Sequence, residues 1–294
     1  MIHKTKLTHN YLELLKKSLV NELYIENEAR IILALSAIFQ NTELTLQDMF
    51  NIKAHDYIFN MLEANKQNGS HLVLCKKNKD GVLENESSTR NVTELSHTMI
   101  GTKRLNNLQY CIETILDDDV PGDLIETGIW RGGATIFMRG VLAAYGNTDR
   151  IVWAADSFEG VPIPTLPEDA KLDLSANVLP ILSVSLDEVM DLFERYDLLD
   201  DQVNFIQGWF KDTLATAPIE KLAVLRLDGD LYESTMDALN PLYGKVSNGG
   251  FIIVDDYYSC PPCQRAIDEY RNAHLIKDEL ITIDEQSVYW RKLR

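Results

Sequence analysis

Positive charge is scarce in this chain of 294 residues. Lys and Arg number 28 against 45 Asp and Glu, which gives a formal net charge of −17. Such a field repels polyanions, so the composition argues against nucleic acid and anionic membrane surfaces as partners. Long apolar runs are also lacking, and residues 1–15 have no signal-peptide core. We therefore expect a cytoplasmic protein that does not span a membrane.

Cysteine is scarce as well, with four residues: Cys75, Cys111, Cys260 and Cys263. The last two form the motif CPPC, a spacing found in redox sites and in half of a zinc site. A second pair with this spacing is missing from the sequence. Two ordinary thiols in a turn made by two prolines are therefore the favoured interpretation, and a zinc or redox role is the alternative.

The dinucleotide-binding pattern GxGxxG is absent too. The stretch TGIWRGG places its glycines at Gly128, Gly132 and Gly133 instead, which counts against a nicotinamide enzyme. These glycines let the backbone turn sharply and approach a ligand closely. A helix that begins near Gly133 would aim its free amide groups at that ligand. The alternative is a tight turn that only serves close helix packing.

The chain does have the composition of a globular protein, with 45% hydrophobic and 25% charged residues. From residue 97 onward, apolar strand-like runs alternate with helical segments. The runs are apolar throughout, as expected when helices cover both faces of a parallel sheet. The alternation predicts an open, doubly wound α/β domain with a mostly parallel sheet. The predicted strands lie at 122–128, 151–158, 203–209, 222–230 and 249–258, and the predicted helices at 106–116, 133–146, 186–196 and 235–246.

Residues 1–96 have a different pattern and form a predicted helical N-terminal region. Residues 8–24 show helical spacing of apolar residues, with Lys16 and Lys17 on the solvent side. The remaining predictions in this region are helices at 26–39 and 54–65, a short strand at 71–77 and an exposed loop or linker at 77–94.

Polar residues end the predicted strands. Glu126 ends the first strand and Asp156 the second, where an acid is well placed to accept hydrogen bonds from ribose hydroxyls. A loop or N-cap carboxylate is the alternative for Asp156. Together with the glycine-rich first turn, Asp156 indicates a nucleoside-containing cofactor. Gln207 and Gly208 end the third strand and are predicted to line an adenine pocket.

Four carboxylates follow the last two predicted strands: Asp228, Asp230, Asp255 and Asp256. Parallel neighbouring strands bring such ends together, and clustered carboxylates repel one another unless a cation joins them. Oxygen ligands of this kind suit Mg²⁺ better than zinc. The alternative is helix capping, by Asp230 or Ser234 for one helix and by Asp256 for the next. Capping leaves one acid on each strand unexplained, so we favour the metal.

Several motifs, in order, resemble the macrocin O-methyltransferase family over residues 97–294. They are TMIGTKRLNNLQYCIE, PGDLIETGIWRGGATIFMRG, VWAADSFEGVP, GWFKDTL, LAVLRLDGDLYESTMDALNPLYGKVSNGGFIIVDDY and the terminal VYWRK. The opening YLELLKKSLVNELY also resembles the first helix of that family. The resemblance implies a Rossmann-like class I methyltransferase fold. It also implies an enzyme that uses S-adenosylmethionine and Mg²⁺ to methylate a hydroxyl of a natural-product sugar, or in some members a phenol.

The resemblance also assigns roles to residues. Asp228, Asp255 and Asp256 would bind Mg²⁺, and Asp228 would also be the general base beside the cofactor. Thr98 and Met99 would close over the methyl donor. The remaining cofactor-binding residues would be Glu126, Thr127, Gly128, Trp130 and Gly132 for the methionine part, Asp156 and Ser157 for the ribose and adenine, and Gln207 and Gly208 for the adenine.

Residues 25–96 depart from this pattern because they are longer than the family's usual connection. The insertion implies an unusual small-molecule acceptor, large or carrier-bound, or an arm that joins two copies; a neutral decoration is the alternative. We expect a homodimer or higher homo-oligomer. The alternatives for the activity are a catechol or phenol O-methyltransferase, an N-methyltransferase, or a non-catalytic binding module on the same fold.

Overall fold

The computed structural model describes residues 5–52, 76–77, 83–84 and 95–293. The chain divides into two compact units, and each is described by itself. One unit comprises Met1–Glu13 together with Lys103–Arg294, and the other comprises Leu14–Thr102. The first unit contains the sheet on which the candidate site is built.

A seven-stranded sheet forms the centre of the first unit, in the order β5-β4-β3-β6-β7-β9-β8. Its first five strands are parallel, and β9 runs antiparallel to both β7 and β8. This confirms the predicted mostly parallel sheet and adds two short antiparallel strands at its edge. The strands are β3 (Asp123–Thr127), β4 (Val152–Asp156), β5 (Val203–Gln207), β6 (Leu222–Leu227), β7 (Val246–Val254), β8 (Ile281–Thr282) and β9 (Val288–Arg291).

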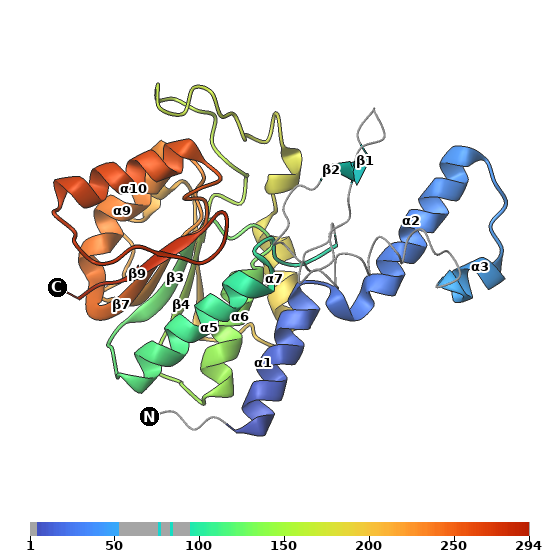
Figure 1. Ribbon diagram of the computed structural model, residues 1–294. Helices are drawn as coiled ribbons and strands as arrows, with labels where there is room; N and C mark the ends of the chain where they lie inside the picture. Colours follow the sequence, from blue (N-terminus) through green and yellow to red (C-terminus); the bar gives the residue numbers. More distant parts are fainter. Residues whose placement is uncertain (1–4, 53–75, 78–82, 85–94, 294) are drawn as a thin grey trace. The chain divides into compact units, whose positions relative to one another are not determined.

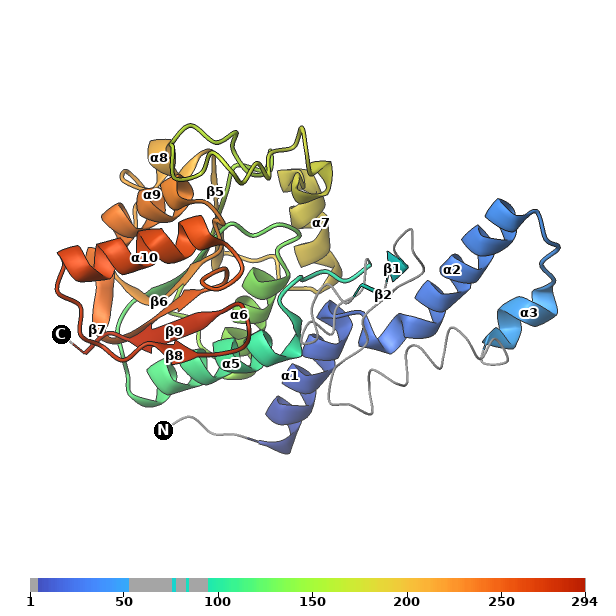
Figure 2. The ribbon, with the colours of Figure 1, turned by 45° about the horizontal axis from the view of Figure 1, so that its top comes forward.

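Helices cover both faces of this sheet. Helices α9 and α10 lie on one face, and α5 and α6 lie on the other (Figures 1 and 2). The order of strands reverses between β3 and β6, which is where doubly wound sheets bind ligands. The helical elements of this part of the chain are α5 (Gly101–Asp117), α6 (Gly133–Ala144), η3 (Pro180–Leu182), α7 (Leu186–Arg195), α8 (Phe210–Thr213), α9 (Tyr232–Leu242), η4 (Tyr243–Lys245) and α10 (Pro261–Ala273).

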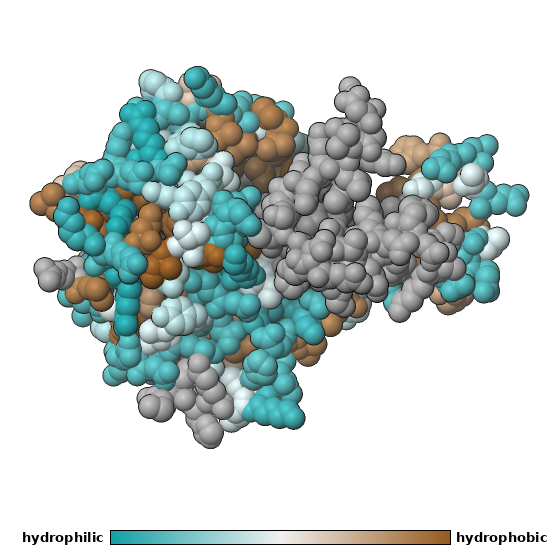
Figure 3. All heavy atoms as spheres, viewed as in Figure 1, coloured by the Kyte–Doolittle hydropathy of each residue, from teal (hydrophilic) through white to brown (hydrophobic). Residues whose placement is uncertain are grey.

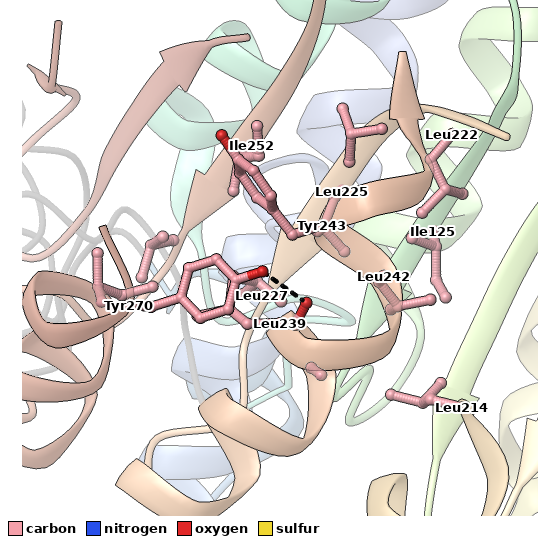
Figure 4. Close-up of a cluster of buried hydrophobic side chains, with 14 of the residues drawn as sticks. Ile125, Leu214, Leu222, Leu225, Leu227, Leu239, Leu242, Tyr243, Ile252 and Tyr270 are labelled. Atoms are coloured by element: carbon pink, nitrogen blue, oxygen red, sulfur yellow. Dashed lines mark hydrogen bonds between the residues drawn. The ribbon is translucent and has the colours of Figure 1, made fainter. Parts of the chain in front are cut away.

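The core between the sheet and helices α9 and α10 explains why the strands are apolar throughout. Alternate strand residues such as Ile125, Leu225 and Ile252 point to this side (Figure 4), and their neighbours are buried as well. Each leucine or isoleucine buried in this way contributes about 1.5–3 kcal/mol. Tyr270 of α10 donates a hydrogen bond to the carbonyl oxygen of Leu239 in α9 at 3.5 Å. This core holds the carboxyl ends of β6 and β7 in fixed positions.

The described part of the N-terminal region is mostly helical. It contains α1 (Lys6–Leu19), η1 (Glu22–Tyr24), α2 (Ile25–Gln40), α3 (Leu46–Phe50), and the two-residue strands β1 (Lys76–Lys77) and β2 (Leu83–Glu84). The first predicted helix stops at Leu19, because Asn21 has a left-handed φ of 59°. Strand β2, paired with β1, lies inside the predicted loop at 77–94. The predicted helix at 54–65 lies outside the described residues, as does most of the predicted strand at 71–77.

One prediction for this region is wrong. Lys16 was expected on the solvent side but is 3% exposed, because it shares the face of α1 that buries Leu12, Leu15 and Leu19. Lys17 is exposed as predicted. Farther along, α2 and α3 expose several large apolar side chains, which appear brown among teal on the right of Figure 3. They include Ile38, Phe39, Leu46 and Phe50. Among the described helices, none combines the length and the apolar character needed to cross a bilayer.

Candidate active site

The register of three parallel strands places the predicted site residues at one edge of the sheet. Thr127 of β3 pairs with Leu227 of β6, which pairs with Val254 of β7. The next residue of each strand therefore emerges at the same level. The amide of Asp228 donates to the Thr127 carbonyl oxygen, and the amide of Asp255 donates to that of Leu227, both at 2.9 Å.

Gly128 makes the closest backbone approach at this edge. Its φ is +87°, and a Cβ added there would lie 1.8 Å from the carbonyl oxygen of Asp228. Only glycine fits a position that combines a left-handed φ with such contact. The turn that follows β3 is thus pressed against the start of the loop after β6.

The rest of the glycine-rich turn is held by Asp156 at the end of β4. One carboxylate oxygen accepts a hydrogen bond from the Ile129 amide and the other accepts one from the Phe158 amide, both at 2.7 Å. Burial raises the pKa of Asp156, and these backbone hydrogen bonds oppose the shift. The Ser157 hydroxyl also donates to one of these oxygens at 3.4 Å, and the Trp130 amide donates to the same carboxylate. The predicted ribose acceptor therefore also shapes the turn.

The other predicted cofactor residues are distributed around this turn. Trp130 has a left-handed φ of 48°, and its indole nitrogen donates to the Ile181 carbonyl oxygen at 2.9 Å. Gly132, with φ +79°, is the N-cap of α6. The Ser157 hydroxyl donates to the Gly160 carbonyl oxygen, and Gln207 is exposed at the end of β5. Residues 98 and 99 belong to the other compact unit.

Arg226, a residue that the sequence analysis did not consider, joins three of the predicted site residues. Its side chain is 1% exposed, and it is the last residue but one of β6. One guanidinium nitrogen donates to Glu126 at 2.5 Å and to Asp228 at 2.6 Å, and another donates to Asp255. A lone arginine in the apolar run LAVLRLD was the available signal, because a buried cation requires carboxylate partners.

A second buried arginine extends this network beyond the strand ends. Arg104 of α5 donates to Asp255 at 2.5 Å, to Asp284 at 2.8 Å and to Gln286 at 2.5 Å. Four carboxylates thus bond to two guanidinium groups: Glu126, Asp228, Asp255 and Asp284 against Arg104 and Arg226. The cluster carries more negative than positive charge when all of these acids are ionised.

The excess negative charge appears in the pKa values. Burial raises the pKa of Glu126 to about 7, although Arg226 opposes this shift. Burial and Asp255 raise the pKa of Asp228, again against Arg226. Burial and the neighbouring carboxylates, Asp230 first among them, raise the pKa of Asp256 well above its usual range. A cation at this point would offset the repulsion that contributes to these raised pKa values.

Asp228, Asp255 and Asp256 meet the requirements for that cation. Each offers one carboxylate oxygen, and these three atoms lie within 4.8 Å of one another. Asp256 is 5% exposed, and its Oδ2 atom has no hydrogen-bond partner within the part of the chain that the structure describes. An ionisable oxygen buried without a partner is costly. A ring of carboxylate oxygens with one such atom fits a hard divalent ion.

The capping alternative for these acids is wrong. No side chain at the N-cap positions of α9 or α10, Leu231 and Cys260, accepts a capping hydrogen bond. The start of α9 is instead capped from a distant loop by Asp169, which is fully buried. Its two oxygens accept from the amides of Tyr232 at 2.7 Å and Glu233 at 3.0 Å. The N-cap residue of α10 is thus Cys260, and not Asp256 as the capping alternative required.

We expect the Asp169→Ala variant to lose about 1–2 kcal/mol of unfolding free energy, since two amides at the start of α9 lose their acceptor. Urea unfolding of the variant measures this loss. Asp173→Ala is the matched control, because Asp173 is exposed in the same loop and its carboxylate accepts from the Ser175 amide rather than from a helix start. Equal stability of the two variants would contradict the capping role.

The CPPC thiols lie beside this cluster. Cys260 is the N-cap of α10, Cys263 lies in its first turn, and both are free and buried. Burial and the neighbouring carboxylates raise the pKa of both thiols. Few thiolates form under such conditions, which disfavours a redox role because the thiolate is the reactive form.

Comparison with known proteins decides the family. The sequence pattern of the Macrocin-O-methyltransferase (TylF) family matches residues 8–292. This chain belongs to the macrocin O-methyltransferase family. The resemblance seen in its motifs is therefore confirmed, and so is the expectation that it is an O-methyltransferase enzyme. The match includes the N-terminal region as well as the sheet.

Two relatives in this family act on natural products. The chain is 58% identical over 203 residues to demethyldecarbamoylnovobiocin O-methyltransferase of Streptomyces niveus, which covers 68% of this chain and 77% of the relative. It is 54% identical over 215 residues to mycinamicin III 3''-O-methyltransferase of Micromonospora griseorubida, which covers 72% of this chain and 84% of the relative.

Solved structures confirm the predicted Rossmann-like methyltransferase fold. The O-methyltransferase NovP superposes with a TM-score of 0.68 at 56% identity, over 69% of this chain and 85% of that chain. The calicheamicin methyltransferase CalS11 superposes with a TM-score of 0.52 at 20% identity, over 64% of this chain and 78% of that one, and shows the fold alone.

Proposed function

We propose that this enzyme transfers a methyl group from S-adenosylmethionine to a hydroxyl of a natural-product sugar, with Mg²⁺ at the acceptor. The observation that carries this proposal is the group of Asp228, Asp255 and Asp256 directly beside the glycine-rich turn. The three carboxylates and the proposed donor site lie at the same edge of the sheet. An acceptor bound to the metal would therefore face the bound donor.

The donor site is proposed at the switch point between β3 and β6. Gly128 lets the turn pass close to the Asp228 backbone, and Asp156 at the end of β4 is the proposed acceptor for the ribose hydroxyls. Glu126, whose pKa is about 7, lies behind the turn, where Thr135 and Arg226 donate to it. Thr127, Trp130, Gly132, Ser157, Gln207 and Gly208 complete the proposed cofactor contacts. Thr98 and Met99 are proposed to close over the donor.

Asp228 is the proposed general base. Its side chain is 26% exposed, whereas Asp255 is nearly covered, so Asp228 is the more accessible of the two to an acceptor. Mg²⁺, when bound, lowers the pKa of a coordinated hydroxyl. Arg226 donates to one Asp228 oxygen at 2.6 Å, and the other oxygen is the proposed acceptor of the hydroxyl proton. Holding donor and acceptor in line supplies much of the remaining acceleration.

The acceptor class rests on the relatives. The named relatives methylate novobiocin and mycinamicin intermediates, and a third, 54% identical over 205 residues, is a 4'-O-methyltransferase for a rhamnosyl tetracenomycin from Streptomyces olivaceus. From these names we infer only the class of acceptor for this chain, which is a sugar hydroxyl of a small molecule. The homo-oligomeric state, the cytoplasmic location and the role of residues 1–96 stay predictions.

Calorimetric binding and an acceptor panel test this proposal. S-adenosylmethionine should bind the full chain, and Mg²⁺ should give a separate binding signal. Methyl transfer should then occur to glycosides with vicinal hydroxyls and should stop when Mg²⁺ is chelated. Failure to bind the donor would overturn the proposal. Transfer only to catechols or amines would replace the acceptor class and keep the donor site.

We expect Mg²⁺ binding to tighten as the pH rises. The raised pKa values of Asp228 and Asp256 mean that the metal-free folded state binds protons more tightly than the unfolded state. Their stabilising contribution is therefore complete below the ordinary carboxyl pKa and is lost as the pH rises through the raised values. Mg²⁺ displaces these protons and reverses the loss.

Thermal unfolding with and without Mg²⁺ over a pH series measures both effects. The metal-free melting temperature should fall as the pH rises, and Mg²⁺ should restore it most at the highest pH. The Asp256→Asn variant should show a smaller fall and a smaller recovery. A recovery by Mg²⁺ that is independent of pH would contradict the raised pKa values.

A further inference from the structure

A second set of metal-ligand side chains lies next to the proposed magnesium ligands. Ligand atoms of Asp230, Asp256 and Cys260 lie within 4.8 Å of one another. Asp230 comes from the loop after β6, Asp256 follows β7, and Cys260 begins α10. The Cys260 thiol donates to an Asp230 carboxylate oxygen at an Sγ–Oδ1 distance of 3.7 Å.

The backbone holds these three side chains together. The Cys260 amide donates to the Asp256 carbonyl oxygen at 2.9 Å, which closes the turn between β7 and α10. Asp230 has a left-handed φ of 58°, a conformation that directs this loop residue toward the turn at some cost in backbone energy. The backbone of two loops thus fixes the positions of these three side chains.

An unpartnered buried atom points to a ligand here. Within the described chain, the Asp256 Oδ2 atom has no hydrogen-bond partner, while Oδ1 accepts from the Ser259 hydroxyl at 3.1 Å. Asp256 is 5% exposed and Cys260 is 8% exposed. A buried carboxylate oxygen without a donor, next to a thiol and a second carboxylate, is suited to a cation.

We propose that Asp230, Asp256 and Cys260 form a second metal site, which selects a borderline-soft divalent ion such as Zn²⁺ or Co²⁺. Sulfur ligands favour these ions, whereas Mg²⁺ takes oxygen ligands. Zinc bound to one sulfur and one carboxylate oxygen at a tetrahedral angle separates the two ligands by about 3.6 Å. The Sγ–Oδ1 distance of 3.7 Å matches this geometry. The bound ion replaces the thiol proton.

Asp256 belongs to both sets of ligands, which couples the two sites. Of its two oxygens, Oδ2 is the one without a partner among the residues that the structure describes, so an ion at the thiol site and Mg²⁺ would compete for that atom. Zn²⁺ at the thiol site would therefore weaken Mg²⁺ binding. This consequence rests on the proposed function, but the binding of the soft ion does not.

Titration of the metal-free full chain with Co²⁺ tests the second site directly. A thiolate bound to cobalt gives a sulfur-to-metal charge-transfer band in the near ultraviolet, which carboxylate ligands alone do not give. The band should appear with wild type and be absent with Cys260→Ser. Cys263→Ser is the matched control, because Cys263 lies in the same motif outside the ligand set, and it should keep the band.

Two further variants and one competition complete the test. Asp230→Asn removes a proposed anionic ligand and should weaken Co²⁺ binding by at least about tenfold. Even mutation of a residue that only supports a metal ligand usually weakens binding by this much. Saturating Mg²⁺ should reduce the band. A wild-type titration without the band, or an unchanged band in Cys260→Ser, would overturn the proposal. The titration contains neither donor nor acceptor, so its failure is distinct from a failure of the methyl-transfer proposal.

Discussion

The Asp228→Asn variant is expected to lose nearly all methyl transfer while it stays folded. Asparagine cannot take a proton, and loss of a general base alone lowers kcat by about 10²–10⁴-fold. The same change removes an anionic ligand from the proposed magnesium site, so Mg²⁺ binding should weaken as well. The fold should persist because Arg226 keeps its bonds to Glu126 and Asp255.

Steady-state kinetics at saturating donor, acceptor and Mg²⁺ measure this loss, and calorimetry measures the binding of each. Donor binding should change little. Asp201→Asn is the control, because Asp201 is an exposed carboxylate in a turn and should keep wild-type activity. If Asp228→Asn kept its kcat at saturating Mg²⁺, Asp228 would not be the base. If only its Mg²⁺ affinity fell, Asp228 would be a ligand alone.

The Gly128→Ala variant is expected to be the most destabilised single substitution at the site. The new methyl group would lie 1.8 Å from the Asp228 carbonyl oxygen, in a backbone conformation with φ +87°. Neither atom belongs to a flexible side chain, so β3 and β6 must separate to relieve the overlap. We expect a loss of more than about 4 kcal/mol, which places this change among the most severe core substitutions.

Two other glycines separate the causes of this loss. Gly146 has a φ of +64° and nothing within 4 Å of an added Cβ, so Gly146→Ala measures backbone strain alone, about 1–2 kcal/mol. Gly244 has no neighbour within 4 Å and no left-handed φ, and Gly244→Ala should be nearly neutral. Denaturant unfolding of the three variants should give this order. A Gly128→Ala variant as stable as Gly146→Ala would show that the strands yield easily.

Local patterns were sufficient to predict the strand ends. Glu126, Asp156 and Gln207 each lie within or at the end of a strand that an apolar run predicted. The acids Asp228 and Asp255 follow β6 and β7 directly, and parallel pairing brings them to one edge as expected. Asp255 and Asp256 both reach the cluster because they lie beyond the strand, where side chains no longer alternate between faces.

Long-range partners were not predictable in this way. Arg104 meets Asp284 across 180 residues, and Asp169 caps α9 from more than 60 residues away. The sequence shows each of these residues as a single charge, with nothing nearby to indicate its partner. The same holds for β9, which the terminal motif VYWRK contains without showing that it pairs antiparallel with β7.

The sequence by itself determined the alternation of strands and helices, the family and the acids that gather at the strand ends. It did so because apolar periodicity and short motifs are set by neighbouring residues. Only the tertiary structure decided which guanidinium neutralises which carboxylate and which acid caps α9. It also decided that one buried Asp256 oxygen has no partner among the described residues. These contacts join residues that are distant in the sequence and meet only when the chain folds. A buried charge is costly without a partner of opposite charge, and this cost favours the pairs that form.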